Sequence, residues 1–339
     1  MSSTSLHACA RSFFKEGKGI LAADESTKTM NKRLRSIGVP EEPEMRRKYR
    51  QLLFTAPNIE EYLTGTIMYD SSIRNKTDDG TPFVDVLIAK GIIPIIKVDK
   101  STTEHTGFPG EVITEGLDGL FERLEEYYEL GARAAKWRAV FSISENTPTE
   151  QTILANSFAL ARYAALCQKA NIVPMVEPEV LFKGAHSLQK AEEVTTYVLT
   201  KMFEILAWYK TDITGMILKT SMVLAGSEHE KESSPEEVAA ATVRVLGSAV
   251  PKEVGGVVFL SGGQTWQRAT ENLNAISNLE PTLPFPTTFS FSRAIEEPIL
   301  EAWGGKEENI ENAQQAMLHR LKMNSLAEKG EYDPSLENG

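Results

Sequence analysis

Cysteine and histidine are both scarce in this sequence. Its two cysteines, Cys9 and Cys167, cannot form a disulfide framework and fit a reducing compartment, so we expect a cytoplasmic protein. The five histidines are scattered (His7, His105, His186, His229 and His319), and none stands beside a ligand-like partner at the end of an expected strand. No glycine-rich dinucleotide fingerprint follows a strand. The sequence therefore predicts neither a metal ion nor a bound cofactor.

Long apolar runs and an excess of basic residues are also missing. No run approaches the ~18 apolar residues that a membrane span needs, and residues 1–14 lack the apolar core of a signal peptide. The net charge of −11 argues against a nucleic-acid-binding surface. It leaves small anionic ligands open, because their binding depends on local cations rather than on total charge. We expect neither a membrane span nor a nucleic-acid partner.

The chain does have enough apolar side chain for one large core. Of its 339 residues, 41% are hydrophobic and 24% are charged, which is typical of a soluble globular protein. This length fits one α/β barrel with insertions. No internal repeat or domain boundary interrupts residues 1–339, so we expect a single domain. Residues 330–339 are polar and are expected to form a flexible tail that frays from Tyr332 onward.

Eight short apolar runs recur along the chain, and each ends in a polar or charged residue. These ends are Asp24, Asp70, Lys97, Lys136, Glu177, Lys219, Ser261 and Arg293. Successive ends lie between 27 residues (70 to 97) and 46 residues (24 to 70) apart, which is about one strand–helix unit each. Continuous apolar strands that alternate with helices indicate a parallel sheet buried on both faces. The sequence therefore predicts a single (β/α)8 TIM barrel with extra terminal helices.

Most of the segments between these strands show a helical pattern. We expect helices over residues 1–17, 41–54, 113–130, 149–170, 186–209, 235–249, 265–279, 294–303 and 309–328. Residues 25–33 instead resemble a polar loop that carries hydroxyl groups and three cations. Together these segments supply the outer layer of the barrel.

In such a barrel, residues at the carboxyl ends of the strands converge on one face, where the chemistry takes place. The residues expected there are Asp24, Lys97, Lys136, Arg138, Glu177, Glu179, Lys219, Ser261 and Arg293. For any one of them, a structural ion pair is the simpler explanation. For the whole set, partial burial of so many charges is costly unless the site serves a charged ligand.

Lys219 is the lysine around which the site is expected to form, and it admits two interpretations. Its ammonium could reach solvent from the mouth of the barrel. Alternatively, desolvation and a nearby cation such as Lys136 could lower its pKa and leave a free amine that attacks a carbonyl. The resulting iminium would accept electrons and allow a neighbouring C–C bond to break.

Two carboxylates on one strand could serve this lysine. Glu177 and Glu179 share a face of the strand at 172–179, since side chains alternate along a strand. They could supply general acid and base catalysis, or they could only neutralise the lysines. Both possibilities remain open from the residues alone.

Two groups of residues could bind phosphates. The turn Ser261-Gly262-Gly263 precedes an expected helix and offers backbone N–H groups and a hydroxyl to an anion. Arg293 follows one strand later, and barrels often bind phosphate after their seventh and eighth strands. At the other end, the side chains of Ser26, Arg33 and Lys97 could hold a second phosphate.

Several stretches resemble class I fructose-1,6-bisphosphate aldolases, the metal-free Schiff-base type, from about residue 13 to residue 332. They are GILAADEST (19–27), IKVDK (96–100), AKWR (135–138), VEPE (176–179), LK (218–219), FLSGGQ (259–264), TFSF (288–291) and AWGGK (302–306). The resemblance implies reversible cleavage of fructose 1,6-bisphosphate into two triose phosphates, in glycolysis and gluconeogenesis. It also implies a homo-oligomer, commonly a tetramer.

The resemblance further implies roles for single residues. Lys219 would form the Schiff base, Glu177 would carry protons during imine formation and C–C cleavage, and Asp24 would orient the amine and the C4 hydroxyl. Lys136 would assist the carbinolamine, and Glu179 would tune the pair. The C1 phosphate would be held by Ser261, Gly262, Gly263, Ser290 and Arg293; Ser26, Arg33, Lys97 and Arg138 are candidates for the far phosphate or the hydroxyls.

The sequence departs from the family pattern at three places. Animal members carry a C-terminal tyrosine that aids proton exchange, whereas the last tyrosine here is Tyr332. Ser292 precedes Arg293 where many members have glycine, and Lys28 and Thr29 replace a glycine and a serine. The residues also leave open a preference for sedoheptulose 1,7-bisphosphate or a non-catalytic scaffold role.

Overall fold

Eight parallel strands close into a barrel in the computed structural model of this chain, which describes residues 3–279 and 282–338. The barrel strands are β1 (Gly19–Ala23), β2 (Leu63–Met68), β3 (Ile93–Lys97), β6 (Ala134–Phe141), β7 (Val173–Val180), β8 (Ile217–Ser221), β9 (Val257–Leu260) and β10 (Thr287–Phe291). They pair in this order, and β10 pairs with β1 to close the ring. The predicted (β/α)8 TIM barrel is confirmed.

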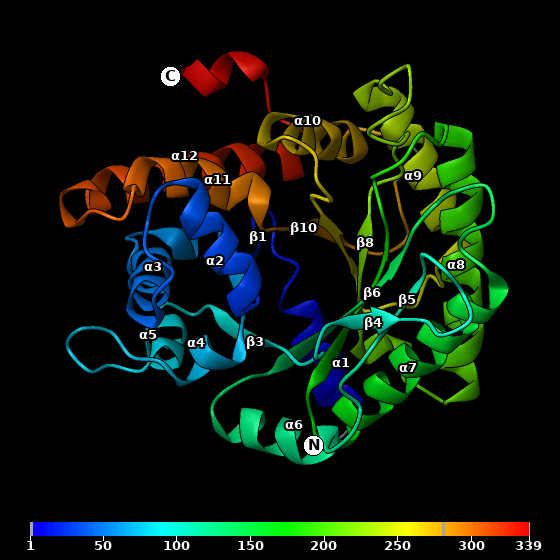
Figure 1. The fold of residues 1–339 in the computed structure, drawn as a ribbon, viewed down its shortest axis with the longest axis horizontal. Coiled ribbons are helices and arrows are strands. Elements are labelled where there is room, and N and C mark those ends of the chain that lie inside the picture. The colour runs from blue at the N-terminus through cyan, green and yellow to red at the C-terminus, as the bar shows by residue number, and fades with distance from the viewer. Residues whose placement is uncertain (1–2, 280–281, 339) are drawn as a thin grey trace.

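Helices surround the barrel (Figure 1). They are α1 (Ser3–Arg11), α2 (Thr27–Ser36), α3 (Pro43–Thr55), α4 (Asp70–Arg74), α5 (Phe83–Ala89), α6 (Leu120–Glu129), α7 (Glu150–Lys169), α8 (Leu188–Trp208), α9 (Pro235–Ala249), α10 (Trp266–Ser277), α11 (Arg293–Trp303) and α12 (Ile310–Glu328). Short 3₁₀ turns lie at Ile59–Glu61, Ile213–Gly215, Glu307–Asn309 and Pro334–Asn338. Within the described residues, no helix is long and apolar enough to cross a membrane.

The prediction of a loop at residues 25–33 is wrong, because helix α2 begins at Thr27. The side chain of Ser26 caps this helix by accepting a hydrogen bond from the backbone N–H of Thr29 at 3.3 Å. Met30 and Leu34, four residues apart, are buried on one face. Two apolar residues among eight polar ones were too weak a signal for a helix, but they suffice to dock it on the core.

The helix expected over residues 113–130 begins only at Leu120. Before it, β5 (Val112–Thr114) pairs in antiparallel fashion with β4 (Thr102–Glu104) as a separate two-stranded sheet. Gly116 and Gly119 both have positive φ angles, of 122° and 61°, which a right-handed helix does not allow. The expected helix over residues 1–17 is likewise shorter and ends at Arg11.

An apolar cluster fills the end of the barrel that lies opposite the carboxyl ends of the strands. Leu6 and Ala10 of α1, together with Phe13, pack against inward-facing side chains such as Ile217 and Val258. Gly65 on β2 makes room for this packing, since a Cβ there would lie 2.7 Å from the ring of Phe13. The amino-terminal segment thus closes this end of the barrel with apolar side chains.

The segment expected to be a flexible tail makes specific contacts in the structure. Glu337, in the 3₁₀ turn, accepts hydrogen bonds from the Arg320 guanidinium at 2.6 Å and from the Tyr332 hydroxyl at 2.9 Å. The ring of His319 lies 3.1 Å from the same carboxylate. Residue 339 lies outside the described residues, and fraying of this segment stays a prediction.

Candidate active site

The barrel interior changes from apolar to charged over a single layer of side chains. Met175 and Ile217 belong to the apolar cluster inside the barrel. Glu177 and Lys219 stand two residues further along the same strands, so their side chains point inward as well. Strands β6, β7 and β8 continue beyond these charged residues, which therefore lie inside the barrel rather than on its rim.

All fourteen residues predicted for the site line one cavity of about 660 Å³ at this end of the barrel. They are Asp24, Ser26, Arg33, Lys97, Lys136, Arg138, Glu177, Glu179, Lys219, Ser261, Gly262, Gly263, Ser290 and Arg293. Ligand-binding pockets commonly have volumes in this range. The structure thus brings the whole predicted set together.

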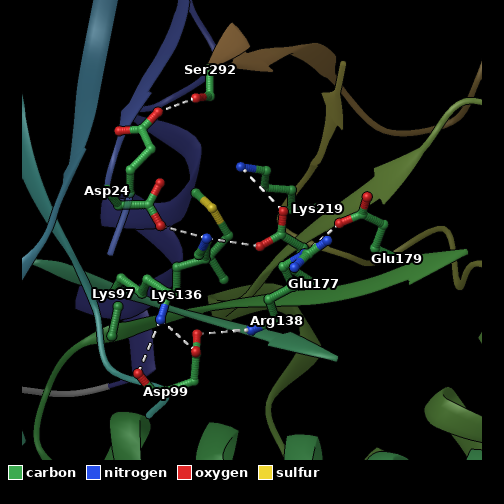
Figure 2. A network of polar contacts seen from close by, with 12 residues as sticks. Asp24, Lys97, Asp99, Lys136, Arg138, Glu177, Glu179, Lys219 and Ser292 are labelled. Atoms are coloured by element: carbon green, nitrogen blue, oxygen red, sulfur yellow. Dashed lines mark hydrogen bonds and ion pairs between the residues drawn. The ribbon is translucent and has the colours of Figure 1, made fainter. Parts of the chain in front are cut away.

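The centre of the site is a chain of buried charges (Figure 2). The Lys219 ammonium lies 3.3 Å from one oxygen of Glu177. The other Glu177 oxygen lies 3.1 Å from Lys136, whose Nζ is also 2.6 Å from Asp24. Only 4% of the Lys219 side chain is exposed, so the interpretation in which its ammonium reaches solvent is wrong.

The two lysines of this chain differ in proton affinity. Burial lowers the pKa of Lys219, and the nearby Lys136 adds to the shift, so that Glu177 does not fully restore it. Burial also acts against charged Lys136, but Asp24 and Glu177 outweigh it and raise the pKa of Lys136 above its usual value. Lys219 is consequently the amine that loses its proton more readily.

The carboxylates remain ionised despite their burial. Desolvation alone would raise the pKa of Asp24, but Lys136 and Lys219 lower it to about 2. The pKa of Glu177 is also lowered, because the charges of Lys136, Lys219 and Arg138 outweigh its burial. Both groups can therefore accept protons at neutral pH.

Two further ion pairs flank the centre (Figure 2). Lys97 lies 2.5 Å from Asp99, and the Nε of Arg138 lies 2.5 Å from Glu179. Asp99 also accepts a hydrogen bond from the backbone N–H of Ser101 at 3.2 Å. These carboxylates fix the positions of the two cations beside the central lysines.

The turn expected to bind a phosphate contains residues in the left-handed region whose backbone donors are free within the described chain. Gly262 and Gly263 have positive φ angles of 55° and 92°, which explains the two glycines. Their N–H groups donate to no other described residue. The buried hydroxyl of Ser290 likewise has no hydrogen-bond partner within the described part of the chain. The side chain of Arg293, at the start of α11, is exposed beside this turn.

A second buried charge cluster lies next to the first, and the sequence did not reveal it. Its members are Glu25, Arg33, Arg50 and Glu296, joined by Ser292. Arg33 lies 2.5 Å from Glu25 and 3.1 Å from Glu296, so this predicted phosphate ligand is already paired with two carboxylates. Arg50 pairs with the same two carboxylates and is only 3% exposed.

Ser292, one of the departures from the family pattern, takes part in this cluster. Its hydroxyl donates to Glu25 at 2.5 Å and accepts from Arg33 at 3.1 Å. It therefore ties the start of α11, and with it the neighbouring Arg293, to the loop after β1. A glycine at this position could not make either contact.

Sequence reasoning also missed some residues that line the cavity. Asp99, Lys183 and Ser227 all line it. The alternation along Lys97-Val98-Asp99 did carry a signal for Asp99, since both end residues face the same way. Lys183 and Ser227 lie on loops, where no periodicity indicates direction. In the described residues no group of three or more His, Cys, Asp or Glu side chains could hold a metal ion.

Comparison with known proteins places this constellation in a family. The profile of the family described as Glycolytic, fructose-bisphosphate aldolase class-I, matches residues 5–339. The chain is 49% identical over 316 residues to fructose-bisphosphate aldolase 6, cytosolic, of Arabidopsis thaliana, covering 93% of this chain and 88% of that protein. It is 48% identical over 324 residues to the cytoplasmic isozyme of Cicer arietinum, covering 95% and 90%.

The fold agrees with these sequence relationships. A crystal structure of fructose-bisphosphate aldolase from Plasmodium falciparum, in complex with TRAP and a small-molecule inhibitor, superimposes with a TM-score of 0.96. The two chains are 42% identical, and the match covers 97% of this chain and 95% of the other. Sequence and architecture thus agree along nearly the entire length. This chain is a member of the class I fructose-bisphosphate aldolase family.

Proposed function

We propose that this enzyme cleaves fructose 1,6-bisphosphate reversibly into dihydroxyacetone phosphate and glyceraldehyde 3-phosphate, through a Schiff base on Lys219. The observation that carries the proposal is the buried Lys219 amine, whose pKa burial and Lys136 lower, 3.3 Å from the Glu177 carboxylate. Such an amine is available as a nucleophile and has a proton acceptor beside it. The named relatives support the reaction class.

Imine formation begins with transfer of a proton from the Lys219 ammonium to Glu177. The free amine attacks C2 of the ketose, and the developing alkoxide is stabilised by Lys136, which stays cationic because its pKa is raised. A proton passes from nitrogen to this oxygen and gives the carbinolamine. Glu177 then returns its proton to the leaving hydroxyl, water departs, and a cationic iminium remains.

The iminium allows the C3–C4 bond to break. Asp24 and Glu177 are both ionised in the free site, so either can accept the C4 hydroxyl proton. We assign orientation of that hydroxyl to Asp24 and the proton transfer to Glu177. The electrons of the C3–C4 bond move to the iminium nitrogen, the aldehyde leaves, and an enamine forms. Protonation of the enamine carbon and hydrolysis release the second product. Glu179, through its pair with Arg138, would tune the charge around Glu177.

We assign the two phosphate groups of the substrate to two groups of residues in the cavity lining. The C1 phosphate would be held by the Ser261-Gly262-Gly263 turn, Ser290 and Arg293, which offer unpaired donors and an exposed guanidinium. The other phosphate and the hydroxyls would contact Ser26, Arg33, Lys97 and Arg138. To bind there, the substrate would share the cations Arg33, Lys97 and Arg138 with the carboxylates that already pair with them.

Borohydride trapping tests the proposal directly. Reduction in the presence of dihydroxyacetone phosphate should attach the triose phosphate to Lys219 and abolish cleavage, as measured by peptide mass spectrometry and a cleavage assay. Cleavage should also survive EDTA, because no step uses a metal. A label on another lysine, or loss of turnover on chelation, would contradict the assignment.

We also infer a cytoplasmic homo-oligomer, a tetramer on the family pattern. Cytosolic and cytoplasmic relatives support the compartment. Three exposed aromatic side chains on α7 and at the end of α8 support self-association. Phe158 is 37% exposed, Trp208 77% and Tyr209 40%. The ring centroid of Phe158 lies 6.2 Å from that of Trp208 and 6.4 Å from that of Tyr209. Light scattering on the purified enzyme tests this, and a monomer would contradict it.

A further inference from the structure

The charges around the cavity do not balance. Its lining contains seven cations and five carboxylates. Each carboxylate forms an ion pair with a lining cation: Glu25 with Arg33, Asp99 with Lys97, Asp24 and Glu177 with Lys136, Glu177 with Lys219, and Glu179 with Arg138. Two lining cations, Lys183 and Arg293, form no ion pair with any residue in 3–279 or 282–338. They supply the uncompensated positive charge of the site.

The backbone holds Lys183 in a fixed place at the mouth. Its segment, which follows β7, is hydrogen-bonded to the loop after β8: Ser227 N–H donates to Phe182 O, and Glu228 N–H donates to Gly184 O, both at 2.8 Å. The two loops approach closely, since a Cβ on Gly226 would lie 2.1 Å from Gly184 O. Lys183 is therefore presented from an anchored segment rather than from a free loop.

The same segment touches the anion-binding turn. The Phe182 ring lies 3.5 Å from the position that a Cβ on Gly263 would occupy, which is ordinary van der Waals contact. Lys183 is the next residue, it is exposed, and it lines the cavity together with Gly262 and Gly263. The flexible side chain of Lys183 therefore carries its ammonium into the same part of the cavity as the free N–H groups of the turn.

We propose that Lys183 is a further substrate-binding residue, which pairs with the phosphate held at the Ser261-Gly262-Gly263 turn and favours substrates that carry a phosphate there. The inference rests on the proposed function, because it takes that turn as a phosphate site. Arg293 comes from the start of α11, after β10, and Lys183 comes from the loop after β7, so they lie on the two sides of β9 in the strand order. Together they place two free positive charges against a phosphate dianion.

The expected size of the effect follows from the position of Lys183 at the solvent edge. An exposed ion pair changes an equilibrium by about two- to fivefold, and salt screens it. Lys183 should therefore act on binding much more than on kcat, because its contact exists equally in the ground state and the transition state.

The test compares Lys183→Met with wild type, since methionine keeps the apolar stem and removes the charge. We expect the dihydroxyacetone phosphate concentration that half-saturates borohydride trapping to rise about threefold at low ionic strength. Dihydroxyacetone, which lacks the phosphate, should trap equally well in both proteins. The difference should shrink at high salt, and Lys183→Arg should restore phosphate binding.

The matched control is Lys322→Met, which removes the same charge from an exposed position on α12 outside the cavity. It should bind dihydroxyacetone phosphate as wild type does. Equal half-saturation for Lys183→Met and wild type would overturn the inference. An equal shift with dihydroxyacetone, or a rise in the KM of the bisphosphate alone, would also overturn it, since the contact would then lie elsewhere. Failure of wild type itself to trap at Lys219 would instead sink the proposed function.

Discussion

Two buried charge clusters lie side by side in this enzyme, and both contain two cations and two carboxylates. One consists of Asp24, Glu177, Lys136 and Lys219, and the other of Glu25, Glu296, Arg33 and Arg50. Neighbouring residues of the chain, Asp24 and Glu25, enter different clusters. Both clusters contain the same numbers of acidic and basic groups, but the basic groups are lysines in one cluster and arginines in the other.

This difference decides which group changes its protonation state when the cluster is buried. In the first cluster the pKa of Lys219 falls, so this amine gives up its proton more readily than Lys136 does. A guanidinium does not lose its proton in a protein, so the second cluster cannot respond in that way. There a carboxyl group responds instead: burial, together with the charge of Glu25, raises the pKa of Glu296 to about 8. On the proposed mechanism the first cluster supplies the nucleophile, whereas the second joins α2, α3 and α11 to each other.

The largest expected effect comes from making the first cluster like the second. Lys219→Arg keeps a cation beside Glu177 but removes the amine that can be deprotonated. We expect the cleavage rate to fall on the order of 10⁴-fold or more, since the covalent route is lost. Lys136→Arg is the matched control, because Lys136 acts as a fixed cation, and it should retain at least about 100-fold more activity than Lys219→Arg. Similar losses in a cleavage assay would remove the distinction between the clusters.

Breaking the second cluster should affect stability before activity. Arg50→Met leaves Glu25 and Glu296 facing each other with one cation fewer, and Arg50 itself is buried away from the cavity lining. We expect the free energy of unfolding in urea to fall by about 3–5 kcal/mol, as for other broken buried ion pairs. The exposed Arg35→Met, which loses only its pair with Glu41, should leave the urea midpoint unchanged. Equal midpoints for the two variants would mean that the buried cluster does not hold the helices.

Glu296→Gln sharpens the comparison through its pH dependence. The pKa of Glu296 is raised from 4.5 to about 8 in the folded state, so the folded protein binds more protons than the unfolded chain between these values. Its contribution is therefore fully present below pH 4.5 and is lost as the pH rises toward 8. Relative to Glu296→Gln, wild type should lose about 2 kcal/mol between pH 6 and pH 8. Parallel melting profiles across that range would contradict the raised pKa.

Much of the first cluster could be predicted from the sequence, because strands impose a simple geometry. An apolar run that ends at Lys219 or Glu177 predicts a buried strand and indicates that the charged residue lies at its carboxyl end. Parallel strands in a barrel then bring such ends together wherever they stand in the sequence. This is why all fourteen expected residues line one cavity although they come from seven strands or their following segments.

The second cluster could not be predicted, because its members stand on helices and loops. A charged residue such as Arg50 in a helix normally faces water, and nothing in its neighbours indicates that it is buried. Its partner Glu296 lies 246 residues away. The same reasoning accounts for α2: its polar sequence looked like a loop, since the contacts that bury Met30 and Leu34 are made with distant parts of the chain. Pairings of this kind depend on how helices pack against each other in the folded protein, which the hydrophobic periodicity of the sequence does not indicate.

The amino-terminal segment that closes the bottom of the barrel affects the order in which substrate enters and products leave. With Leu6, Ala10 and Phe13 sealing the base, the deepest part of the cavity is a blind end, and the reactive lysine stands just above it. On the proposed mechanism, the ketone must enter first to reach that amine, and the fragment that stays covalently bound to Lys219 must leave last. The aldehyde has no bond to Lys219 and can depart ahead of it, so the covalent bond and the closed base of the barrel together set the order of product release.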